Sequence, residues 1–261
     1  MKPLVAFALI SVVALLGSRF VRVSESGVTS VDLGRRVYEA EGCIHCHSQF
    51  DRPDSLDTRI YGPPSPLPSS EPGAALVGNR RQGPDLSNVG LRRSREWERA
   101  HLLDPGQVTP GSRMPSYGYL FQGADQRGEA LLDYLMSLRT KDTQAWLSQQ
   151  QGWRLSVEPG SKVAGAALFA RLCVGCHGET AKGDGPLAPR FALPPADLAD
   201  GQFRFAPVAL PESARREMLG RIVKYGIQGA SMPGHEYLTD QEISDLVTFV
   251  MSFAVRSDRS S

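Results

Sequence analysis

The chain has 261 residues, enough for one large or two small domains, and its 41% hydrophobic and 22% charged content is ordinary for a globular protein. The net charge of +1, from 29 basic and 28 acidic residues, gives no argument for nucleic acid or for a strongly acidic partner. All four cysteines lie in two Cys-x-x-Cys-His runs, so none remains for a disulfide framework.

Residues 1–23 form a hydrophobic segment with a basic start. Its apolar run from Pro3 to Gly17, at ~1.5 Å per helical residue, is shorter than a ~30 Å hydrocarbon core. A signal peptide fits this length, with the small residues Ser24 and Ser26 near the cleavage point. A retained membrane anchor fits as well, because residues 20–23 extend the stretch, and the lack of an Ala-x-Ala site favours it. Both interpretations predict that the rest of the chain is exported.

The remainder of the chain repeats one pattern twice. Each copy has a helix before the first cysteine, expected at residues 31–42 and 162–172, then Cys-x-x-Cys-His, a Pro/Gly-rich loop and a Met-Pro dipeptide. Each copy closes with an amphipathic helix, the second of which begins with a Thr239/Glu242 capping box. The apolar residues at i, i+3, i+4 and i+7 are Leu131, Tyr134, Leu135 and Leu138 in the first closing helix, and Ile243, Leu246, Val247 and Val250 in the second.

Two copies predict two complete all-α domains in tandem rather than a solenoid. We expect the first domain at residues 28–140 and the second at 159–255. Residues 141–158 are expected to form a Gln-rich linker whose Trp146 and Trp153 pack on one or both domains. A Pro-rich insert at residues 51–73 has too little periodicity for a regular element.

Both Cys-x-x-Cys-His runs are c-type haem attachment motifs. Two thioether bonds to one haem need cysteines about one helical turn apart, and the next residue then lies where its imidazole can reach the iron. A single match could be a zinc half-site, but two matches in the same order of elements predict two covalently attached c haems. The predicted attachment and ligand residues are Cys43, Cys46 and His47 in the first domain, and Cys173, Cys176 and His177 in the second.

Elimination among the methionines predicts Met114 and Met232 as the sixth iron ligands. Both lie in loops and precede a proline, which restricts the backbone of the residue before it. The initiator Met1 is set aside. The other three, Met136, Met218 and Met251, stand beside apolar residues in helical patterns, as packing residues do.

Three further histidines are alternatives as ligands. His45 lies between the haem cysteines and is expected to face solvent, and His101 lies in a helical stretch, 96–103, as a surface or packing residue. His235 follows Met232 closely and remains a rival ligand.

The surroundings of each haem are also partly predictable. The ring N–H of a ligating histidine usually donates to a backbone carbonyl, and a proline carbonyl in the turns at 83–86 and 194–198 is the expected acceptor. A local cluster of arginines is expected either to form a solvated helix face or to supply one or two partners for haem propionates. These arginines are Arg80, Arg81, Arg92, Arg93, Arg95 and Arg99.

Ligation of each iron by histidine and methionine leaves no open position for oxygen, peroxide or nitrite. A thioether ligand also raises the reduction potential relative to two histidines. The pattern therefore predicts an electron relay through two haems and no catalysis by the chain itself. The alternatives are a di-haem shuttle that serves several enzymes, and a di-haem enzyme such as a peroxidase or a thiosulfate-type dehydrogenase, which would need an open or unusually ligated haem.

The first domain also carries a series of motifs at 34–38, 42–49, 52–53, 59–62, 83–86, 96–97, 101–105 and 114–117. Together they resemble the mono-haem cytochrome subunit of cbb3-type terminal oxidases. The resemblance implies a class I cytochrome c fold, a membrane anchor, a periplasmic location, and iron ligands at His47 and Met114. It also implies a haem–copper oxidase, or another respiratory complex, as the redox partner.

The second domain resembles a generic class I cytochrome c, and its loops at 183–185 and 194–198 resemble those of the di-haem subunit of the same oxidases. The chain departs from the mono-haem family in its second cytochrome domain and in its short N-terminal segment. If that segment is cleaved, the expected location is the soluble periplasm instead of the periplasmic face of the membrane.

Overall fold

The computed structural model describes residues 28–49, 80, 82–139 and 142–257. Within these ranges the chain forms helices and loops, with one isolated bridge between Gly226 and Pro233 in place of strands. The all-α prediction is confirmed for this part of the chain. The N-terminal hydrophobic segment and the insert at 51–73 lie outside the described residues. Among the described residues, no helix has the length and apolar character needed to cross a bilayer.

The first domain is built from short helices that surround the first Cys-x-x-Cys-His run. The predicted helix before this run ends at Ala40, two residues earlier than expected, because Glu41 caps it and Gly42 takes a left-handed φ of 73°. The elements are α2 (Ser30–Ala40), α3 (Cys43–Cys46), α5 (Val89–Arg92), α6 (Arg95–Leu103), α7 (Pro105–Val108), the 3₁₀ helix η1 (Gly118–Phe121) and α8 (Arg127–Ser137).

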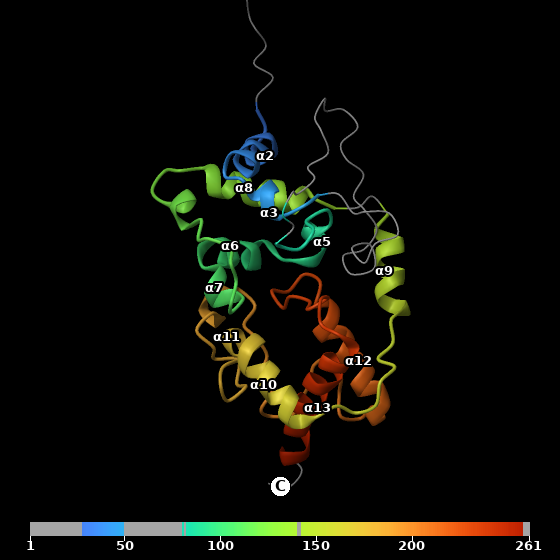
Figure 1. Ribbon diagram of the computed structural model, residues 1–261. Coiled ribbons are helices and arrows are strands. Elements are labelled where there is room, and N and C mark those ends of the chain that lie inside the picture. The colour runs from blue at the N-terminus through green and yellow to red at the C-terminus, as the bar shows by residue number, and fades with distance from the viewer. Residues whose placement is uncertain (1–27, 50–79, 81, 140–141, 258–261) are drawn as a thin grey trace, which may run out of the picture.

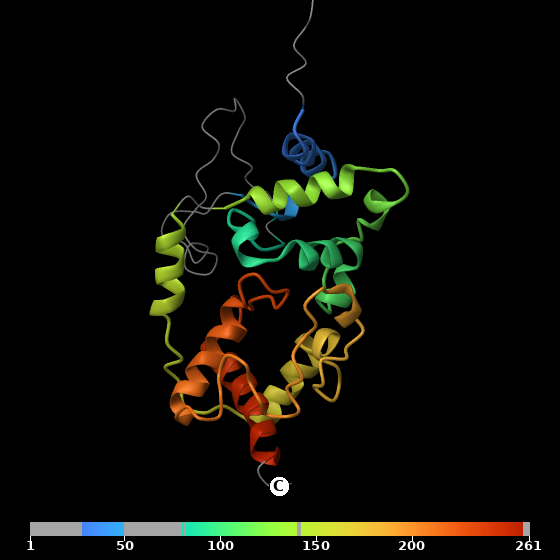
Figure 2. The same cartoon turned by 180° about the vertical axis from the view of Figure 1, so that it is seen from behind.

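The second domain lies against the first at α6 and α7, and α9 runs along one side of both (Figures 1 and 2). The predicted capping box of its last helix is confirmed, because Glu242 accepts from the Thr239 N–H at 2.9 Å and Thr239 Oγ1 accepts from the Glu242 N–H at 3.2 Å. The elements from the linker onward are α9 (Thr143–Gly152), α10 (Lys162–Leu172), α11 (Val174–His177), η2 (Ala188–Arg190), α12 (Glu212–Tyr225) and α13 (Asp240–Ser257).

The linker contains a helix that its sequence did not predict. Helix α9 begins where the Asp142 carboxylate accepts from the Ala145 N–H at 2.8 Å. Beyond the helix, Trp153 packs edge-on against Tyr225 with ring centroids 6.0 Å apart, and the Lys224 ammonium lies 5.6 Å from its ring centre. The linker is therefore attached to the second domain, as the tryptophans led us to expect.

A glycine allows the first and last helices of each domain to cross closely. A Cβ on Gly34 of α2 would lie 1.9 Å from the carbonyl oxygen of Ala130 in α8. A Cβ on Gly165 of α10 would lie 2.0 Å from the carbonyl oxygen of Asp245 in α13. Only a residue without a side chain permits this contact, so both domains use the same crossing.

An aromatic residue four positions after each glycine completes the crossing. Tyr38 lies 5.5 Å from Tyr134, and Phe169 lies 5.3 Å from Phe249, between ring centroids. Tyr38 and Phe169 are both buried. Each domain has its own core around this contact. The buried residues at its centre include Leu120, Leu131 and Leu132 in the first domain, and Ile243, Leu246 and Val247 in the second.

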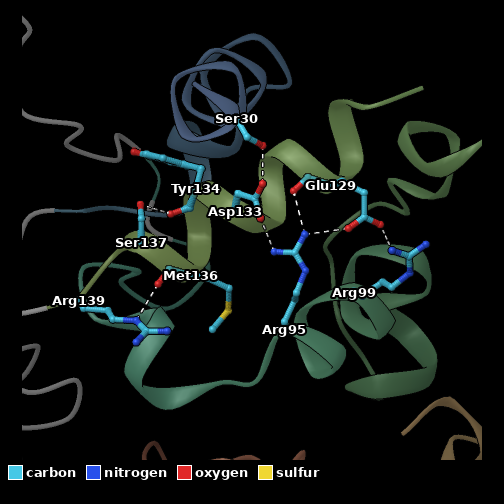
Figure 3. A network of polar contacts seen from close by, with 9 residues as sticks. All are labelled: Ser30, Arg95, Arg99, Glu129, Asp133, Tyr134, Met136, Ser137 and Arg139. Atoms are coloured by element: carbon cyan, nitrogen blue, oxygen red, sulfur yellow. Dashed lines mark hydrogen bonds and ion pairs between the residues drawn. The ribbon is translucent and has the colours of Figure 1, made fainter. Parts of the chain in front are cut away.

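Polar contacts tie α2, α6 and α8 together on the surface of the first domain (Figure 3). Arg95 of α6 pairs with Glu129, at 2.8 Å, and with Asp133, both on α8. Ser30 of α2 donates to the same Asp133, and Arg99 pairs with Glu129. These groups are about half exposed, so each pair contributes at most ~1 kcal/mol, and the packing of the helices supplies most of the stability.

Candidate functional site

The two Cys-x-x-Cys-His runs have the same local geometry. In each, the histidine N–H donates to the carbonyl of the first cysteine, at 2.9 Å for His47 and Cys43 and at 2.8 Å for His177 and Cys173. The run is thus one helical turn, which brings both cysteines and the histidine to one short segment. None of the four cysteines is paired in a disulfide, and all four are partly buried.

The thiols are unlike those of a zinc site. Burial raises the pKa of Cys43 and Cys176 to about 11 and that of Cys173 to about 12, so these thiols are neutral at pH 7. In the ranges that the structure describes, His, Cys, Asp and Glu nowhere form a group of three or more that could hold a metal ion. The lack of such a group among the described residues argues against a zinc site at either pair of cysteines.

The His47 ring is oriented by a hydrogen bond to the backbone. Its Nδ1–H donates to the carbonyl oxygen of Pro84 at 2.9 Å, which leaves Nε2 as the free nitrogen. Burial lowers the pKa of His47, so the imidazole is neutral at pH 7, as an iron ligand must be. The predicted proline carbonyl is confirmed in this domain.

The His177 ring is held in the same way, but the acceptor differs from the prediction. Its Nδ1–H donates to the carbonyl oxygen of Ala196 at 3.1 Å, and burial lowers its pKa too. The prediction of a proline acceptor is therefore wrong in this domain. In both domains the acceptor directly precedes an Asp-Leu pair, and aligning the two turns on that pair would have predicted Ala196.

Gly83 packs against the His47 ring, and we expect Gly83→Ala to disturb iron ligation. A Cβ at this position would lie 2.3 Å from Cε1 of the ring, whose hydrogen bond to the Pro84 carbonyl would have to break if the ring moved away. The variant is expected to shift the visible spectrum and lower the potential of one haem, measured by redox titration. Gly106→Ala is the control, because its Cβ would make only an ordinary 3.7 Å contact with Asp104. Unchanged spectra in Gly83→Ala would contradict the packing argument.

The two candidate methionines occupy different surroundings. Met114 is half-buried and packs against the first core together with Cys43 and Ile44 of the attachment segment. Met232 is half-buried in the loop between α12 and α13, where its carbonyl accepts from the Ile227 N–H at 3.1 Å. The structure thus joins Met114 and Cys43 in one cluster. The assignment of both methionines as ligands stays a prediction.

The three other histidines have environments of their own. His45 is exposed, as expected. His101 stacks on Trp97 with ring centroids 4.7 Å apart, which fits the packing role predicted for it in a helix that the structure places at α6. The His235 ring nitrogen Nδ1 lies 3.3 Å from the Tyr237 hydroxyl. Its partner at this nitrogen is therefore a tyrosine of its own loop.

Buried polar groups near the first attachment segment were missed by the sequence analysis. The Tyr38 hydroxyl donates to the His47 carbonyl at 2.9 Å, and the Tyr134 hydroxyl donates to Gln49 Oε1 at 2.7 Å. Gln49 Nε2 is buried and has no hydrogen-bond partner within the described residues. A buried amide donor so close to His47 is a feature that a bound polar group, such as a haem propionate, would satisfy. The sequence could have predicted polar groups here, because Ser48 and Gln49 directly follow the first attachment motif.

Of the six clustered arginines, Arg80 is exposed, Arg81 lies outside the described residues, and the other four divide into two pairs. Arg95 and Arg99 form the solvated helix face that was one of the two expectations. Arg92 and Arg93 are instead buried, and both lie near Glu236 of the second domain. Arg92 also donates to the Asp85 carbonyl at 2.7 Å.

Glu98 on α6 is a buried carboxyl group whose protonation should make stability depend on pH. Burial raises its pKa to about 7, against the opposing effect of Arg93 and Arg92. The folded state therefore holds this proton more tightly than the unfolded state does, so stability falls as pH rises from about 4.5 through 7, by about 3 kcal/mol. We expect Glu98→Gln to lose this decline in denaturant titrations at pH 5 and pH 8. The exposed Glu129→Gln is the control and should keep it. A decline of equal size in Glu98→Gln would assign it to other groups.

Each domain therefore presents two thiols one turn apart and a neutral imidazole with one free nitrogen, a set that fits covalently attached haem c. Comparisons with known proteins agree. The family model described as "Cytochrome C oxidase, mono-heme subunit/FixO" matches residues 9–142, and the family model "Cytochrome c" matches residues 163–254.

Two other comparisons add no argument. A search of curated proteins finds no match. Among solved structures, a chain of the Kuenenia stuttgartiensis reducing HAO-like protein complex is 18% identical, covers 85% of this chain and 96% of its own, and has a TM-score of 0.32. With the FixO model matching more than half of its residues, the chain belongs to the family of mono-heme subunits of cytochrome c oxidase, and it is an electron-transfer cytochrome with a second cytochrome c region behind the family domain.

Proposed function

We propose that the chain carries two covalently bound c haems and is an electron-transfer subunit of a respiratory membrane complex, a cbb3-type haem–copper oxidase. In this proposal the N-terminal segment exports the chain and holds it at the periplasmic face of the membrane. The chain passes electrons and does not itself transform a substrate.

One observation carries the proposal. The same arrangement, a Cys-x-x-Cys-His turn whose histidine donates Nδ1–H to a backbone carbonyl, occurs in both domains, at 2.9 Å and 3.1 Å. The first of these domains lies in the region that the FixO model matches. Two such turns support two haems, and the family supports an oxidase as the complex.

The residues of the chain would fix each haem and tune it. Cys43 and Cys46, like Cys173 and Cys176, would hold the vinyl groups. His47 and His177 would bind iron through Nε2, because Nδ1 is engaged by a carbonyl. The haem supplies an iron that gains and loses one electron.

The other groups act on the environment of the iron. Met114 and Met232 would each supply a thioether ligand to one iron and so exclude small ligands. Burial of His47 and His177 disfavours the charged ring, so no proton competes with iron for Nε2 at pH 7.

Isolation of the full chain from native membranes in mild detergent tests the proposal. We expect co-purification with a haem–copper oxidase, and two low-spin haems, each with a methionine–iron charge-transfer band. If the protein never co-purifies with an oxidase, the subunit assignment fails and the di-haem shuttle takes its place. A high-spin haem in the resting protein, or turnover of peroxide, would instead favour an enzyme.

A further inference from the structure

The two domains meet where α6 of the first domain faces the loop between α12 and α13 of the second (Figures 1 and 2). Ser231 Oγ of this loop donates to Glu96 Oε2 at 2.9 Å and lies 3.1 Å from Ser94 Oγ. The loop is the one that carries Met232. A candidate iron ligand of the second domain is therefore part of the segment that contacts the first.

The centre of this contact is a buried ion pair between Arg93 and Glu236. Arg93 Nη1 donates to Glu236 Oε1 at 3.0 Å, and Nη2 donates to Oε2 at 2.9 Å. The same Nη2 donates to the Gly234 carbonyl at 2.9 Å. The side chains are only 11% and 3% exposed, so the pair is bidentate and shielded from solvent.

Arg93 and Glu236, called the docking pair from here on, both stay charged in these surroundings. Burial alone would raise the pKa of Glu236, but Arg93 and Arg92 outweigh it and lower the pKa to about 2. The Arg93 guanidinium also lies 5.2 Å from the centre of the Trp97 ring. A buried pair adds little net stability, but breaking it leaves a lone charge in the interior, so it favours one arrangement of the two domains over others.

A second, apolar contact brings the haem-attachment segment of the second domain to the same face. Ala100 of α6 forms a buried cluster with Leu187 and Phe191 of the second domain, and Cys176 packs against this cluster. A Cβ on Gly175 would lie 3.5 Å from the carbonyl oxygen of Gln107 in α7. The attachment turn of the second domain therefore rests on α6 and α7 of the first.

Helix α6 also packs into the first domain. His101 directly follows Ala100 and stacks on Trp97 at 4.7 Å. Leu102 of the same helix belongs to the buried core cluster of the first domain, against which Cys43 and Ile44 of the first attachment turn pack. Helix α6 thus packs with Cys176 through Ala100 and shares a core cluster with Cys43 through Leu102.

We propose that Arg93 and Glu236 are positioning residues that lock the two cytochrome domains into one electron-transfer unit, in which α6 packs toward both haem-attachment turns. This inference rests on the proposed function, because it requires a haem in each domain. Electron exchange across the contact oxidises one iron from Fe(II) to Fe(III) and reduces the other from Fe(III) to Fe(II), so it needs no further reactant.

Two variants of the full-length protein with haem attached test the docking pair. Arg93→Met removes one partner, and Glu236→Gln keeps the size of the other, in case the first variant does not fold. Arg95→Met is the matched control, because Arg95 pairs with Glu129 and Asp133 within the first domain. The readouts are the magnetic interaction between the two oxidised irons, by electron paramagnetic resonance, and the radius of gyration, by small-angle X-ray scattering.

We expect a magnetic interaction between the irons in the unmodified protein and in Arg95→Met. In Arg93→Met and Glu236→Gln the docked fraction, and with it the rate of internal electron exchange, should fall by about tenfold or more, with an increased radius and unchanged haem spectra. The proposal would be overturned if all four proteins showed the same magnetic interaction and the same radius of gyration. It would also be overturned if the unmodified protein showed no magnetic interaction between its irons. Failure to co-purify with an oxidase would refute the proposed complex and leave these readouts unaffected.

Discussion

Replacing Met114 by alanine will convert one haem, and only one, to a high-spin or alternatively ligated form. The thioether has no substitute in an alanine side chain, so the iron is left with an open position and its potential falls by on the order of a few tenths of a volt. Met232→Ala is expected to do the same to the other haem. Visible spectra with carbon monoxide and redox titration of each variant measure the effect.

Methionines with packing roles provide the control for these variants. Met218 and Met251 pack against the core of the second domain, so Met251→Ala should lower stability and leave both haems low-spin. Unchanged spectra in Met114→Ala or Met232→Ala would refute the assignment at that haem. For the second domain, His235 is then the first residue to test, since it lies three positions from Met232.

Alanine at either helix crossing is expected to destabilise its domain by about 3 kcal/mol. In Gly34→Ala the new methyl group would overlap the Ala130 carbonyl, and in Gly165→Ala it would overlap the Asp245 carbonyl. Neither oxygen can move without separating two helices, so the core between them opens. Thermal unfolding, followed by circular dichroism, measures the loss.

The linker helix offers a matched control for the crossing variants. Gly152 has open space around the position of a Cβ and no left-handed φ, so Gly152→Ala should be neutral or slightly stabilising. A loss of similar size in Gly152→Ala and Gly165→Ala would show that the crossing is not responsible.

The features that the sequence predicted well are local ones. The attachment turns follow from the spacing of cysteines and histidine, and the closing helices follow from apolar residues at a period of 3.6. The capping box of Thr239 and Glu242 predicted the start of α13, because it involves only residues that are close together in the chain.

The features that it did not predict depend on distant partners or on weak patterns. Arg93 and Glu236 are 143 positions apart, and nothing in either segment identifies the other. Helix α9 has no apolar stripe, and a cap at Asp142 is its clearest signal. The crossing glycines had a usable signal, because Gly34 and Gly165 each stand four residues before a buried aromatic residue in the same helix.

The attachment of the linker at Trp153 bears on what happens when the docking pair is broken. Because this tryptophan is fixed on Tyr225 and Lys224, the tether between the domains is confined to the linker residues that precede it. A short tether keeps two partners at an effective concentration of roughly millimolar, so separation of the domains is followed by frequent re-encounter. Loss of the ion pair should therefore make the contact intermittent, and lengthening the linker should be needed to abolish it.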